Sequence, residues 1–117
     1  MSIESDLYTV LSGVCARAFP DFAPTSTTRP YVTYQQIGGE VVNYLGREVP
    51  SKRNARFQVN VWADTRASAT STAQAIEDAI RLSTRFQASP ESALTADFDA
   101  DFPVYSARQD FNIWADR

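Results

Sequence analysis

The chain has 117 residues, a formal net charge of -3, 44% hydrophobic residues and 21% charged residues. This length fits one domain, residues 1–117, around one hydrophobic core. The chain has no histidine and one cysteine, Cys15, which removes the commonest general base and metal ligand, structural zinc and an internal disulfide. It has no apolar run of about 20 residues and no signal-peptide pattern, so we expect a protein made in the cytosol, without a membrane partner.

The N-terminal segment is typical of an amphipathic helix. Ser2 is a plausible N-cap, and we expect the helix to end near Ala18. Cys15 lies near its apolar stripe, which predicts a buried structural thiol rather than a nucleophile. The segment 19–30 is rich in proline and predicts a loop. The apolar stripe of the N-terminal helix has the spacing i, i+4, i+7, i+8, i+11 and consists of Ile3, Leu7, Val10, Leu11 and Val14.

Two strands are expected next. Residues 31–37, YVTYQQI, are rich in β-branched and aromatic residues and end at two glycines, Gly38 and Gly39. In the second strand three apolar residues alternate with Arg56, Gln58 and Asn60, as in a half-buried strand. The apolar members are Phe57, Val59 and Val61.

The second half predicts a helix and two more strands. Asp64 or Ser68 is expected to cap the helix, which fades near Phe86. Its apolar stripe is Ala69, Ala73, Ile76, Ala79 and Ile80. A weak strand is expected at residues 94–102 and a stronger one at residues 105–114.

The motifs NVWAD (residues 60–64) and NIWAD (residues 112–116) are nearly identical. Both are interpreted as ends of amphipathic strands, with Asn and Trp on one face and the apolar neighbours on the other. Duplication of a helix–strand–strand unit remains an alternative.

The expected order is therefore α-β-β-α-β-β. Short connections favour antiparallel hairpins. If the second and fourth strands are neighbours, the strand order is 1-2-4-3. The predicted fold class is α+β: a two-layer sandwich with a four-stranded antiparallel sheet and both helices on its apolar face.

Charge is unevenly distributed along the chain, and this predicts an assembly surface. A basic stretch and an acidic stretch of opposite sign favour head-to-tail association of copies; two solvated loop regions are the alternative. The loop from Gly38 to Lys52 is longer than a tight turn needs and carries apolar residues without a core position, so we expect an assembly element there. The alternative is a loop folded back on the sheet edge. The candidate interface residues are Arg47, Lys52, Arg53, Arg56, Tyr44, Leu45, Asp97, Asp99 and Asp101.

Catalytic and ligand-binding motifs are weak. The acidic run matches the first calcium-loop positions, but Phe102 and Arg108 stand where the loop needs glycine and glutamate. Gly38 and Gly39 form no phosphate-binding motif. The chain is acidic, and the outward positions Gln58, Asn60, Asp110 and Asn112 are neither basic nor aromatic, unlike those of an RNA-recognition sheet. We therefore predict no enzyme, cofactor, metal or sequence-specific nucleic-acid partner, and a function in contact with other proteins.

Three segments together resemble a known family. They are RPYVTYQQIGGEVVNYLG, RNARFQVNVWADTRASATSTAQAIEDAI and VYSARQDFNIWAD. In order and spacing they resemble the small tail-completion proteins (tail terminators or tail-to-head joining proteins) of long-tailed bacteriophages and prophages. The matching residues are Pro30, Tyr31, Val32, Tyr34, Arg56, Gln58, Val59, Val61, Trp62, Tyr105, Asp110, Phe111, Ile113 and Trp114.

The resemblance implies a structural virion-assembly protein. Copies would form a homo-oligomeric ring of six on the tail tube, end its polymerisation and join it to the head. The implied partners are other copies, the tail-tube protein and the head connector. The implied location is the host cytoplasm during assembly, then the head-proximal end of the virion tail. Two alternatives remain: another head–tail adaptor or tail component, and a small ligand- or peptide-binding module.

Overall fold

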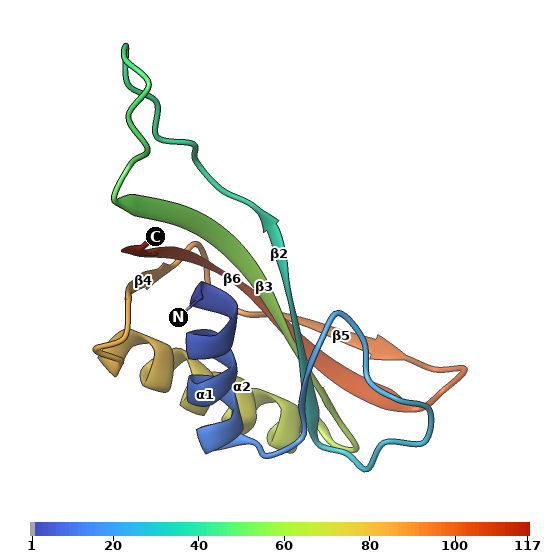
Figure 1. The fold of residues 1–117 in the computed structure, drawn as a ribbon. Coiled ribbons are helices and arrows are strands. Elements are labelled where there is room, and N and C mark those ends of the chain that lie inside the picture. The colour runs from blue at the N-terminus through green and yellow to red at the C-terminus, as the bar shows by residue number, and fades with distance from the viewer. Residues whose placement is uncertain (1) are drawn as a thin grey trace.

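The computed structural model describes residues 2–117 and has an α+β fold. Over these residues it contains two helices and a six-stranded mixed sheet (Figure 1). The strand order is β1-β2-β3-β6-β4, and β5 also pairs with β6. The elements are α1 (Ile3–Val14), β1 (Ala18–Pro20), β2 (Tyr31–Gly38), β3 (Lys52–Ala63), α2 (Arg66–Leu82), β4 (Gln87–Pro90), β5 (Thr95–Asp99) and β6 (Val104–Asp116).

The predicted order of the four longer strands agrees with the pairing β2-β3-β6-β5. The predicted strand number and the wholly antiparallel sheet are wrong. The additional strand β1 runs parallel to β2, and β4 pairs with β6 beyond the end of β5. Both additional strands are short and contain proline, so neither has an alternating pattern long enough to recognise. They exist because a longer strand offers a free edge beside them.

The helix ends differ slightly from the prediction. Ser2 caps α1 as expected, and its hydroxyl accepts a bond of 3.1 Å from the Ser5 amide. The helix stops at Val14, so Cys15 is its C-cap rather than part of the helix, although the thiol is buried as predicted. Thr65 caps α2 instead of Asp64 or Ser68. Its hydroxyl accepts from the backbone amide three residues later, as an N-cap does.

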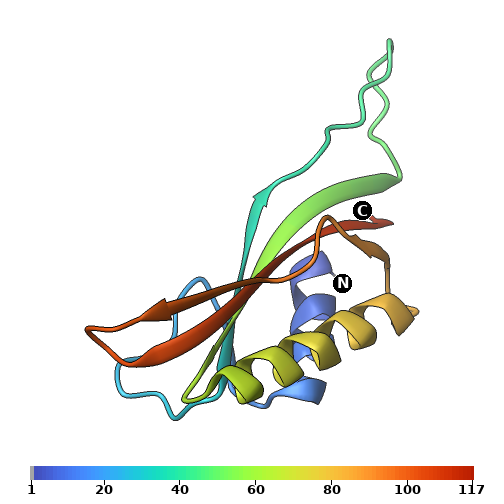
Figure 2. The same cartoon turned by 180° about the vertical axis from the view of Figure 1, so that it is seen from behind.

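Both helices cover one face of the sheet, and the other face carries no helix (Figures 1 and 2). The alternation predicted for β3 and β6 is confirmed. Between the sheet and the helices lies one core, which includes Ile3, Leu7, Leu11, Phe57, Val59, Val61, Ala69, Ala73, Ile76, Ile80, Phe111 and Ile113. Within residues 2–117, neither helix is long and apolar enough to cross a membrane.

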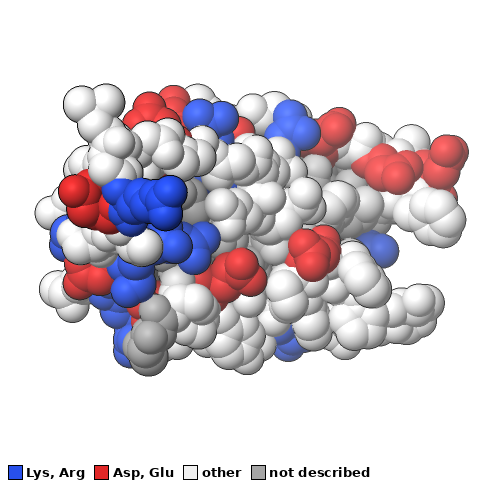
Figure 3. Space-filling model, turned by 45° about the horizontal axis from the view of Figure 1, so that its top comes forward, with Lys and Arg blue, Asp and Glu red and all other residues white. Residues whose placement is uncertain are grey.

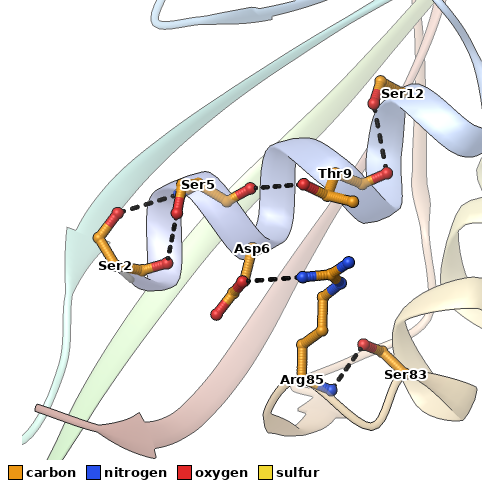
Figure 4. Close-up of polar contacts among 7 residues, drawn as sticks. All are labelled: Ser2, Ser5, Asp6, Thr9, Ser12, Ser83 and Arg85. Carbon is orange, nitrogen blue, oxygen red and sulfur yellow. Dashed lines mark hydrogen bonds and ion pairs between the residues drawn. The ribbon is translucent and has the colours of Figure 1, made fainter.

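A polar link joins the start of α1 to the segment after α2 (Figure 4). The buried Asp6 carboxylate accepts from Arg85 Nη1 at 3.3 Å. The amide of Arg85 donates to the Ser83 hydroxyl at 3.2 Å, which fixes the turn that follows α2. The charge of Asp6 is therefore paired where the two helices meet, as a buried carboxylate requires.

Candidate assembly surface

The loop between β2 and β3 is an arm that projects away from the body of the protein (Figures 1 and 2). We define the arm as residues 39–51, which contain no helix or strand. The alternative of a loop folded back on the sheet edge is therefore wrong. The body of the protein has a buried hydrophobic core, but four large apolar side chains of the arm are exposed. They are Val41, Tyr44, Leu45 and Val49.

The base of the arm is anchored through Asn54, a buried residue of β3. Its Oδ1 accepts from the Glu40 amide at 2.7 Å, and its Nδ2 donates to Asn112 Oδ1 and to the Ile113 carbonyl. Gly39 lies directly against this residue. Its φ is +145°, and a Cβ there would stand 2.8 Å from the Asn54 carbonyl oxygen. Only glycine combines this conformation with this close approach, so the arm leaves the sheet at a defined point.

The predicted basic residues lie in the arm or at its end of the sheet. Arg47 lies in the arm and makes no ion pair among the described residues. Lys52 pairs with Asp116, and Arg53 donates to Gln36 at 3.4 Å. Arg56 lies further along β3, where its Nε is 3.4 Å from a Glu91 carboxylate oxygen.

The predicted acidic residues lie at the opposite end of β6. Asp97 and Asp99 are in β5, which within residues 2–117 pairs with β6 alone, and Asp101 is in the following turn. Asp99 Oδ1 accepts from the Asp101 amide at 3.0 Å. β5 is thus an exposed edge strand with a charged face, and such charges oppose unwanted strand pairing.

The two groups of charges are therefore separated in space. Figure 3 shows Lys and Arg gathered at one end, with acidic side chains among them, and an acidic group at the opposite tip. The longest dimension of the chain is 53 Å. The structure brings Tyr44, Leu45 and Arg47 together in the arm, with Lys52 and Arg53 at its base. It does not bring them near Asp97, Asp99 or Asp101.

A surface hollow beside the acidic hairpin was not predicted from the sequence. Its volume is about 330 Å³, and it lies between the end of β3 and the β5–β6 hairpin. Trp62 forms one wall and is stacked on Tyr31, with ring centroids 6.3 Å apart. The other lining residues are Asp97, Phe98, Asp99, Ala100, Val104 and Ser106. The alternation of Trp62 with Val61 indicated the face of Trp62, but only the pairing of β5 with β6 closes the hollow.

The helix-free face of the sheet is polar. Across β3 and β6 it carries Gln58, Asn60, Asp110 and Asn112, all half-buried. Asp110 Oδ1 is buried and has no hydrogen-bond partner among the described residues. Because these polar side chains are half-buried and neither of the described helices covers them, this face is a surface rather than a core, as the two-layer prediction requires.

A hydrogen-bonded group on the helix side supports the β4–β5 connection. The buried Gln109 amide of β6 donates to Glu77 Oε1 at 2.7 Å and to the Ser92 carbonyl at 2.8 Å. The bond from Gln109, with a smaller contribution from Arg81, lowers the pKa of Glu77. These contacts fix α2 and the chain leading into β5, and so help to position the hollow.

Comparison with known proteins identifies the family. A family model described as tail completion protein gp17 matches residues 4–116. The chain belongs to this family. The resemblance expected from the strand motifs is thereby confirmed. Membership supports a structural role in a bacteriophage tail and a location in the virion.

Solved structures give the same fold. Among the solved structures, 31 chains match this chain significantly. One, from the virion of a native gene transfer agent particle, has a TM-score of 0.64 and 16% identity, covering 99% of this chain and 96% of that chain. A second has a TM-score of 0.52 and 12% identity, covering 96% of each. Identities this low show the fold alone. A search of curated proteins gave no significant match.

Proposed function

We propose that this tail-completion protein caps the tail tube, stops its polymerisation and joins the tail to the head. The observation that carries the proposal is the family match over nearly the whole chain. The arm adds support, because exposed apolar side chains on a projecting segment are typical of a protein interaction site. The assembled state is a ring of six copies at the head-proximal end of the tail, formed in the host cytoplasm.

A ring requires heterologous contacts, in which two different surfaces of each copy meet. The arm and the acidic hairpin lie at opposite ends of the chain, and this separation supports an arrangement in which they are the two surfaces (Figure 3). One face of the ring would meet the last tail-tube subunits, and the other would meet the head connector.

Deletion of the gene tests this function. Electron microscopy of lysates from the parent phage or induced prophage should show overlong or ragged tail tubes beside separate filled heads. A plasmid copy of the unchanged gene should restore joined particles of uniform tail length. Intact particles of normal tail length without the gene would contradict the proposal. Normal-length tails that fail to join heads would retain the joining role and remove the termination role.

A further inference from the structure

The arm and the hollow have complementary chemistry. The arm offers the exposed side chains of Tyr44 and Leu45, followed two residues later by Arg47. The hollow offers the Trp62 ring within an apolar and acidic lining. Its volume of about 330 Å³ has room for one or two large side chains. Protein interfaces typically combine an apolar core, enriched in aromatic residues and Arg, with a polar rim, and complementary charges orient the partners.

Carboxylates are available at the hollow. Asp97 Oδ1 accepts from the Phe98 amide at 2.8 Å, and Asp99 Oδ1 accepts from the Asp101 amide at 3.0 Å. Neither aspartate forms an ion pair among residues 2–117. Each therefore retains a second oxygen that can accept from an incoming guanidinium.

The arm cannot reach the hollow of its own chain. Lys52 begins β3 and Trp62 is its last residue but one, and the ten residue steps between them span about 33 Å of strand. Half of a 13-residue arm reaches at most about 23 Å. The arm also points away from the sheet, in the direction opposite to the β5–β6 hairpin (Figure 1). A contact between these surfaces must therefore come from another copy.

We propose that the arm of one copy docks in the hollow of the next copy, with Leu45 and Tyr44 against Trp62 and Arg47 paired with Asp97 and Asp99. The occupant is a second copy of this chain, so the inference rests on the proposed assembly of several copies. Because arm and hollow are different surfaces, the contact is heterologous, and repetition around a closed rotation gives a ring.

Cysteine cross-linking in assembled particles tests the contact directly. Leu45→Cys and Ala100→Cys place one thiol on the arm and one in the hollow; the native Cys15 is buried. Particles carrying both changes should give a disulfide-linked ladder under mild oxidation, and particles mixed from the two single variants should give dimers only. The matched control pairs Leu45→Cys with Ala96→Cys, an exposed position of β5 outside the hollow lining. It should give little product.

Failure of this inference can be told apart from failure of the proposed function. Particles of normal tail length that contain the doubly substituted chain but give no 45–100 product would overturn the docking and leave the capping function intact. Efficient cross-linking of Leu45→Cys alone would also overturn it, because arms would then meet arms. Normal tails after gene deletion would remove the function itself.

A charge exchange gives an independent answer if the cysteine variants fold poorly. Arg47→Asp should weaken association between copies by more than about tenfold. Adding Asp97→Arg and Asp99→Arg to the same chain should restore most of it, measured as the fraction of chains incorporated into tails. Absence of rescue, with each variant folded by circular dichroism, would contradict the pairing.

Discussion

Single residues decide how the arm leaves the sheet. Gly39 combines a positive φ with a close approach to the backbone of Asn54, and the Asn54 side chain joins the arm base to β6. The neighbouring Gly38 also has a positive φ, +139°, but no atom stands within 4 Å of its Cβ position. Substitutions at the two glycines therefore separate the effect of the positive φ, which both share, from the effect of the close contact with Asn54, which only Gly39 makes.

We predict that Gly39→Ala disturbs the arm base more than Gly38→Ala. Strain from the left-handed conformation costs about 1–3 kcal/mol at either position. Only at Gly39 must the backbone also move away from the Asn54 carbonyl, which breaks the bond from the Glu40 amide. Hydrogen exchange should show faster exchange at Glu40 in Gly39→Ala, with near-normal protection in Gly38→Ala. Equal protection in both variants would show that the close approach does not hold the arm.

At the scale of elements, helix-to-sheet links position the acidic hairpin. Gln109 of β6 joins α2 through Glu77 and the β4–β5 connection through Ser92. Glu77 also pairs with Arg81 one turn later, with Nε and Oε2 3.0 Å apart. Because the folded protein favours the carboxylate of Glu77, its pKa lies below the usual value.

This lowered pKa predicts a pH-dependent contribution to stability. The contribution is fully present above the unfolded-state pKa of Glu77 and is lost as pH falls through the lower folded-state pKa. It is small, because the side chain is partly exposed. Glu77→Gln should therefore lower the free energy of unfolding at pH 7 and make less difference near pH 3, measured by urea titration. A difference independent of pH would rule out this role of the charge.

At the scale of the whole molecule, the chain is an elongated body with chemically different ends. The arm carries apolar and basic side chains, and the β5–β6 hairpin carries aspartates (Figure 3). The core lies between them on the helix side, so changes at either end need not disturb it. We therefore expect mutations at either end to affect the proposed assembly without unfolding the chain.

Charge reversal of Arg47, Lys52 and Arg53 together should leave the monomer folded and prevent assembly. In the proposed contact the positive charge at the arm end orients docking, whereas among the described residues Lys52 and Arg53 make only exposed contacts within their own chain. Incorporation into tails is the readout, with thermal unfolding as the test of folding. Replacement of the same three residues by Gln is the matched control and should give an intermediate defect. Normal assembly of the reversed variant would remove the basic residues from the interface.

The sequence by itself indicated the two helices and the four longer strands, because each has a period long enough to recognise. It gave the strand order only on the condition that the second and fourth strands are neighbours, and the structure supplied that pairing. It also indicated the family through the order of the motifs around Tyr31, Trp62 and Trp114. Only the tertiary structure revealed β1 and β4, whose three and four residues form strands by pairing with a longer neighbour. It also decided the antiparallel register that places the two Asn-x-Trp-Ala-Asp motifs at opposite ends of the sheet.

The candidate interface was also predictable from the sequence only in part. Local composition was enough to select the arm and the acidic run, since exposed apolar residues and like charges are visible in sequence. The hollow was not predictable, because its walls come from β3, β5 and β6, and only their pairing brings Trp62 beside Asp97 and Asp99. Chemistry within one segment is determined locally, whereas a concave surface depends on contacts between residues far apart in the chain.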